Sequence, residues 1–128
     1  MPDVALERAH DREMLERFAS LEAGTPEYGA LRDALIERHL PLVHFLARKF
    51  ADRGEPLDDL VQVGTIGLIK AIDRFDAGRG FEFSTYASPT IVGEIKRHFR
   101  DKTWAVRVPR RLQELGAAVE KARTELTH

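Results

Sequence analysis

The sequence predicts an all-α fold in which several helices share one core. Apolar residues recur mostly at the three- and four-residue spacing of helices, and no stretch shows the alternation of period two that is typical of strands. Hydrophobic residues make up 43% of the 128 residues, which is enough for the core of one compact domain, or of a small domain with a flexible arm. Short segments that contain glycine or proline separate the predicted helices.

The first two helices are predicted over residues 3–22 and from Pro26 to about Asp52. The segment Gly24-Thr25-Pro26 ends the first helix and begins the second. Pro41 lies inside the second apolar pattern. Because proline has no backbone N–H and crowds the preceding turn, we expect it to kink or split this helix around His39 and Leu40.

A third helix is predicted to follow a turn at residues 53–56 and to end at Phe75. Asp58 can cap its N-terminus. Gly64 and Gly67 interrupt the apolar pattern, and each costs about 1 kcal/mol relative to alanine in a helix. We therefore expect them where another segment approaches the backbone closely, or where the helix tightens.

The next helix follows a loop at residues 76–80 and has two possible starting points. Ser84 can cap a helix that runs to about Lys102 with a kink at Pro89, or Ser88 can cap a helix whose first residue is Pro89. Of the two, we favour the longer helix. A last helix is predicted to begin at Pro109.

The charges are divided unevenly along the chain, although the formal net charge is only −1. Residues 1–40 hold nine acidic side chains against five Lys or Arg, whereas residues 94–112 hold seven Lys or Arg against two acids. Salt screens each charge beyond about 10 Å, so the local excess matters more than the total. Taken alone, the basic segment is more typical of a solvated helix face; with Phe83 and Tyr86 just upstream, it has the combination of rings and cations that binding of single-stranded nucleic acid requires.

Several functional classes are excluded or disfavoured. The sequence has no cysteine, which excludes disulfides and thiolate metal sites. No apolar run approaches the roughly eighteen residues of a membrane span, and the first ten residues do not form a signal peptide, so we expect a cytoplasmic protein without membrane contact. Enzyme motifs are missing and the five histidines lack metal-ligand spacing, so we expect no enzymatic activity, metal or cofactor.

Four motifs carry a specific resemblance. LVQVGTIGLIKAIDRFD (60–76), GRGFEFSTYA (78–87), PTIVGEIKRHFRD (89–101) and VPRRLQEL (108–115) resemble, in order and spacing, region 2 and the start of region 3 of bacterial RNA polymerase sigma factors of the sigma-70 superfamily. The similarity is greatest to the alternative, stress and sporulation (group 3) type. It implies region 2 over 31–107 and the start of region 3 over 108–128. Residues 1–30 show no comparable match, and we expect them to form an N-terminal helical arm. No contact with the −35 element is expected from these residues.

The resemblance implies a surface that binds a coiled coil of the β′ subunit of core RNA polymerase. Five residues of the third predicted helix stand at matching positions: Asp59, Leu60, Gln62, Thr65 and Ile69. Leu60 and Ile69 are equally consistent with core packing. Val63 stands where housekeeping members carry an acid.

The resemblance also implies two pockets for bases of the promoter −10 element. Arg79, Phe81 and Tyr86 match the pocket for a base that is flipped out of the duplex, where stacking on an aromatic ring restores roughly 1–3 kcal/mol of the lost stacking. His39 and Leu42 match a second pocket for a downstream base of the same, non-template strand. Phe83 fits the core better than a pocket.

The remaining DNA contacts are implied for the basic segment. Lys96, Arg97 and Arg100 are spaced to hold phosphates. Pro89 and Thr90 replace the two tryptophans with which housekeeping members wedge the upstream edge of the melted DNA. Arg107, Arg111 and Glu114 lie at the entrance to region 3, where the family reads bases just upstream of the −10 element, and Arg111 and Glu114 match the reading positions. Glu114 is equally consistent with a surface acid that pairs with a neighbouring arginine.

The resemblance therefore implies an alternative sigma factor domain that binds core RNA polymerase, recognises and melts the −10 element, and is regulated by an anti-sigma factor. Two alternatives stay open. One is an interaction module whose basic helix binds an acidic partner protein. The other is a free-standing DNA-binding regulator, which binding to duplex DNA without polymerase would favour.

Overall fold

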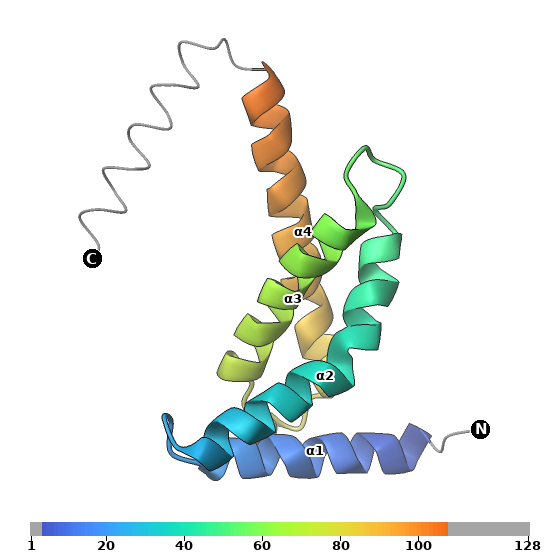
Figure 1. Cartoon of the computed structure of the whole chain (residues 1–128). Helices are drawn as coiled ribbons and strands as arrows, with labels where there is room; N and C mark the ends of the chain where they lie inside the picture. The colour runs from blue at the N-terminus through green and yellow to red at the C-terminus, as the bar shows by residue number, and fades with distance from the viewer. Residues whose placement is uncertain (1–3, 108–128) are drawn as a thin grey trace. The chain divides into compact units, whose positions relative to one another are not determined.

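The computed structural model describes residues 4–107, and within this range the regular structure is entirely helical, which confirms the all-α prediction (Figure 1). The elements are α1 (Val4–Ser20), α2 (Pro26–Arg48), α3 (Leu57–Arg74), the 3-10 turn η1 (Ala77–Arg79) and α4 (Phe83–Arg107). Contacts divide the chain into two compact units, residues 1–95 and 96–128, which are described separately. The helix predicted from Pro109 lies outside the described residues, as do the side chains of 103–107.

The start of α2 follows its local signal, whereas the cap predicted for α3 does not form. Thr25 caps α2 as its side-chain oxygen accepts a hydrogen bond from the backbone N–H of Tyr28 at 3.2 Å, and Pro26 takes the first helical position. The prediction that Asp58 caps α3 is wrong, because the helix already begins at Leu57 and Pro56 occupies the cap position. Asp58 lies instead in the first turn, where the helix dipole favours an acid.

Both internal prolines lie within continuous helices. Pro41 does not split α2, although Figure 1 shows the helix changing direction along its length. The longer form of the fourth helix is confirmed, since α4 runs through Pro89 from Phe83 to Arg107. Because the helix begins before Ser84, neither serine starts it; the Ser88 hydroxyl instead donates to the Ser84 carbonyl at 2.7 Å.

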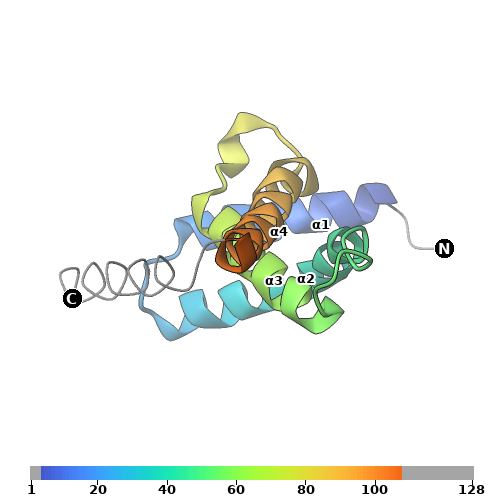
Figure 2. The ribbon, with the colours of Figure 1, turned by 90° about the horizontal axis from the view of Figure 1, so that it is seen from above.

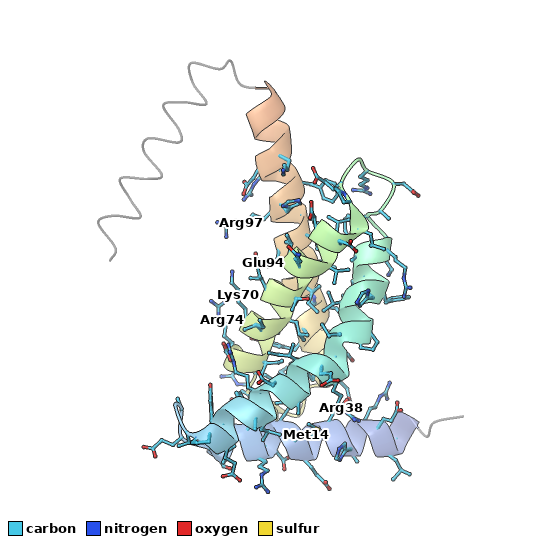
Figure 3. All side chains as sticks on the ribbon, in the orientation of Figure 1. Met14, Arg38, Lys70, Arg74, Glu94 and Arg97 are labelled. Carbon is cyan, nitrogen blue, oxygen red and sulfur yellow. The ribbon has the colours of Figure 1, made fainter. Side chains whose placement is uncertain are left out.

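The core forms where α2, α3 and the first part of α4 meet. Leu35 and Val43 of α2, Leu60 and Leu68 of α3, and Ile91 of α4 are all fully buried. Two ion pairs join neighbouring helices at the margin of this core: Arg32 to Asp73 at 2.8 Å, and Lys70 to Glu94 at 2.5 Å, the latter labelled in Figure 3.

The helical glycines mark close approach of helices, as expected. A Cβ on Gly67 would lie 2.8 Å from Ile91 Cα and 3.0 Å from the Thr90 carbonyl oxygen, and one on Gly64 would lie 2.9 Å from a Val43 methyl group. Gly67 thus faces the backbone of α4, whereas Gly64 faces side chains. The missing side chains let α3 approach α4 closely at Gly67 and Val43 of α2 closely at Gly64, at a cost in helix propensity.

α1 packs on the domain rather than extending from it. It contacts both α2 and η1, with Leu15 and Phe18 buried. The predicted boundary at 30/31 falls inside α2, because that helix begins at Pro26. Figure 2 shows the connection between α3 and α4, which contains η1, projecting from the helices. Among the helices of residues 4–107, none has the length and apolar content that crossing a membrane requires.

Replacing Gly67 by alanine is expected to lower the free energy of unfolding by about 1–3 kcal/mol, because the new methyl group meets backbone that no side-chain rotation can clear. Gly29→Ala in α2 is the matched control, since a Cβ there meets nothing within 4 Å. This substitution should raise the free energy of unfolding by up to about 1 kcal/mol. Urea unfolding measures both. An unchanged or raised stability of Gly67→Ala would contradict the packing argument.

Candidate nucleic-acid interface

The three residues predicted to form the first base pocket lie together around one hollow. Arg79 from η1, Phe81 from the following loop and Tyr86 from α4 line it, and its volume is about 410 Å³. The other lining residues, which the sequence reasoning missed, are Arg74, Phe75 and Asp76. The hollow therefore combines three aromatic rings with two arginines and one carboxylate.

The rings are partly exposed but supported from within. Phe81 is 61% exposed and Tyr86 36%, so both present ring surface to solvent. The Tyr86 ring lies 5.4 Å from that of Phe75, which meets Phe83 edge-on at 5.2 Å. Phe83 is buried, which confirms the expectation that it belongs to the core. Ring contacts of this kind fix the exposed Tyr86 ring and limit the entropy lost when a planar ligand binds.

Asp76 organises the turn that carries Arg79. One of its carboxylate oxygens accepts from the backbone N–H of Gly78 at 3.0 Å, and the other accepts from Arg79 Nε at 3.2 Å. Gly80 then takes a positive φ of 75°, which favours glycine. The Asp-Ala-Gly sequence is a recognisable turn signal, so the role of Asp76 could have been found from the sequence.

The residues predicted for the second base pocket lie deeper. His39 is 8% exposed; its Nδ1 lies 2.8 Å from the Leu35 carbonyl oxygen and its ring 4.6 Å from that of Phe83. Asp11 of α1 lies over it, with a carboxylate oxygen 3.6 Å from His39 Nε2 and an ion pair to Arg38. Leu42 is half-buried. A base could reach His39 only if α1 moved.

Three predicted phosphate contacts lie in the part of α4 that belongs to the second unit. Lys96, Arg97 and Arg100 are all exposed, and Arg100 lies 3.9 Å from Asp101. Their spacing of one, three and four residues gathers them on one side of a helix. The side chain of Arg107 and both Arg111 and Glu114 lie outside the described residues.

The predicted polymerase-binding residues lie on α3. Asp59 and Gln62 are exposed, Thr65 and Ile69 are half-buried, and the Thr65 hydroxyl donates to the Val61 carbonyl at 2.7 Å. Leu60 is fully buried, so it packs in the core and supports this face from within. Ile66, which is 49% exposed and one turn beyond Gln62, was missed. It gives the face an apolar centre.

Few other features suggest chemistry. The hydrogen bond from Arg32 of α2 to Asp73 of α3 raises the pKa of that guanidinium above its usual value. Within residues 4–107 no group of three or more histidine and carboxylate side chains could hold a metal ion.

Comparisons with known proteins identify the family of this chain. Residues 35–105 match the family Sigma-70 region 2. The chain is 53% identical over 120 residues to an RNA polymerase sigma-F factor of Kitasatospora aureofaciens, covering 94% of this chain and 40% of that protein. It is 47% identical over 123 residues to the RNA polymerase sigma factor SigF of Mycobacterium tuberculosis, covering 96% and 47%.

A third relative is an RNA polymerase sigma-B factor of Bacillus subtilis, 47% identical over 96 residues, with 75% of this chain and 37% of that protein covered. The chain thus spans less than half the length of these relatives. The family match covers more than half of the chain and includes all the lining residues of the hollow. The chain therefore belongs to the sigma-70 family of RNA polymerase sigma factors and to its alternative, group 3 type, which includes the stress and sporulation factors.

Proposed function

We propose that this chain carries the part of an alternative sigma factor that binds core RNA polymerase and recognises and melts the promoter −10 element. The observation that supports it most directly is the hollow at Arg79, Phe81 and Tyr86. A base that leaves the duplex loses stacking worth a few kcal/mol, and an exposed ring with a rigid support can replace much of that loss. Arg74 and Arg79 would attract the adjoining phosphates.

The outward face of α3 is the proposed contact with the β′ coiled coil. Asp59 and Gln62 supply polar groups around Ile66 and Ile69, so the face combines an apolar centre with a polar rim, as stable protein interfaces do. Thr65 lies beside them, and the buried Leu60 fixes the helix that presents them.

The remaining candidate contacts extend this proposal. Lys96, Arg97 and Arg100 would hold phosphates, and Arg107, Arg111 and Glu114 would read bases upstream of the −10 element. His39 and Leu42 would form the second pocket only after a displacement of α1, because Asp11 lies over His39.

The role would be carried out in the cytoplasm, where bacterial RNA polymerase works, and would require no covalent chemistry by this chain. Regulation by an anti-sigma protein belongs to the same proposal, because members of this group are commonly held inactive in that way.

The test is a selection of single strands by the chain bound to core polymerase. A pool of non-template strands randomised over the −10 positions is incubated with this complex, and the bound strands are sequenced. Enrichment of one −10 sequence, which neither core polymerase alone nor the free chain enriches, is expected. The proposal fails if the chain does not bind core polymerase, or if the complex enriches no sequence.

The exposed Pro89 and half-buried Thr90 lead to a prediction about promoter opening. Without an aromatic wedge to offset unstacking, the wild-type holoenzyme is expected to open weakly matched promoters slowly. The double variant Pro89→Trp/Thr90→Trp should speed that opening, by about tenfold for each 1.4 kcal/mol by which the new rings lower the activation free energy. Single-turnover opening assays measure both rates, with Pro89→Ala as control. Ready opening of weak promoters by the wild type would count against this explanation.

A further inference from the structure

α2 presents an outward face that none of the proposed contacts uses. Four positions on its C-terminal half and the C-cap residue that follows the helix are exposed, and each lies one, three or four residues from others of the set: Pro41, His44, Phe45, Arg48 and the cap Lys49. Residues at such spacings share one side of a helix. The buried residues Val43, Leu46 and Ala47 lie on the other side and pack in the core.

Phe45 is the centre of this face. Its side chain is 53% exposed, although a buried phenyl ring would contribute roughly 1.5–3 kcal/mol to stability. The Lys49 ammonium group lies 4.6 Å from the centre of the ring, in cation–π contact. The ring is therefore kept at the surface beside a cation, and a partner that covers it would gain apolar contact.

The charge of the face has one sign. No acidic residue occurs between Leu40 and Ala51, whereas Arg48 and Lys49 are both exposed. The outward face of α3 differs, since exposed Asp58 and Asp59 stand at its N-terminal end. The face of α2 therefore attracts an acidic partner, whereas the N-terminal end of the α3 face attracts a basic one. A partner surface of one charge does not fit both helices.

We propose that this face of α2 binds an acidic amphipathic helix of a partner protein. Apolar side chains of that helix would cover Phe45 and Pro41, while flanking carboxylates would pair with Arg48 and Lys49. A single-stranded nucleic acid fits less well, because it needs successive stacking rings, and this face has one ring already in contact with Lys49. The separate hollow at Tyr86 is lined by three aromatic rings and suits a nucleic acid better.

The test is a selection of displayed random peptides on immobilised wild-type protein, with depletion on Phe45→Ala/Lys49→Glu. Enriched peptides are expected to combine acids with apolar residues at intervals of three and four. A synthetic peptide with an enriched sequence should bind Phe45→Ala and Lys49→Glu, each tested alone, about tenfold or more weakly than it binds the wild-type protein. A loss of this size is usual when a central contact of an interface is removed. Leu6→Ala and Arg8→Glu, which change exposed residues of α1, are the matched controls and should bind normally.

Tyr86→Ala should also bind the synthetic peptide normally, which separates this face from the proposed DNA site. Circular dichroism checks that every variant is folded. The inference is overturned if the enriched peptides bind the depleting variant equally, if they are basic, or if no peptide requires Phe45 and Lys49. Oligothymidylate binding that Phe45→Ala abolishes would assign the face to nucleic acid instead.

Discussion

Replacing Tyr86 by alanine is expected to weaken binding of the selected −10 strand to the holoenzyme by about 5- to 150-fold, the equivalent of the 1–3 kcal/mol that one base–aromatic stack contributes. Tyr86 is 36% exposed on the hollow and supported by Phe75 at 5.4 Å, so its loss removes a stacking surface that is already positioned. Fluorescence anisotropy with a labelled strand measures the affinity.

Two controls separate stacking from structural damage. Tyr86→Phe keeps the ring and should retain most of the affinity. A strand with an abasic site at the flipped position should bind wild type and Tyr86→Ala about equally, because neither complex can form the stack. An equal loss on the intact and abasic strands, or a loss of polymerase binding, would contradict the proposed role.

The helices could largely be predicted because their signals are local. Thr25 with Pro26 marks the start of α2, and the apolar period carries α4 through Pro89 despite the missing N–H. The error at α3 has a local cause. Pro56 has φ −60° and ψ 139° and ends the preceding turn, so the helix begins at Leu57 before Asp58 can cap it.

The site was harder to predict where it depends on packing between distant segments. Arg79, Phe81 and Tyr86 are near one another in the chain; the resemblance implied that they form one pocket, and they line one hollow. The burial of His39 was not anticipated. It depends on the packing of α1 against α2, which brings Asp11 next to His39 although the two residues are 28 positions apart in the sequence. Similarly, Leu60 and Ile66 are both apolar residues of α3, and only the packed structure shows that one is buried and the other exposed.

Neutralising Lys96, Arg97 and Arg100 together is expected to flatten the salt dependence of promoter binding. The logarithm of the affinity falls linearly with the logarithm of the salt concentration, and each phosphate contact on duplex DNA adds about 0.9 to the steepness of that fall. The loss of three contacts should therefore make the slope shallower by about 2.7. All three side chains are exposed, and their loss removes little core packing. The affinity should fall by a similar factor on different promoter sequences, because phosphate contacts position the protein and carry no sequence information.

Titrations of the holoenzyme on promoter DNA at several salt concentrations measure this slope, with Arg48→Ala as the control cation outside the basic segment. That control should leave the slope unchanged, because Arg48 lies on the α2 face proposed to bind a protein. An unchanged slope in the triple variant would mean that the basic segment is a solvated helix face. A loss confined to one promoter sequence would instead mean that one of the three side chains reads a base edge, since only such contacts distinguish sequences directly.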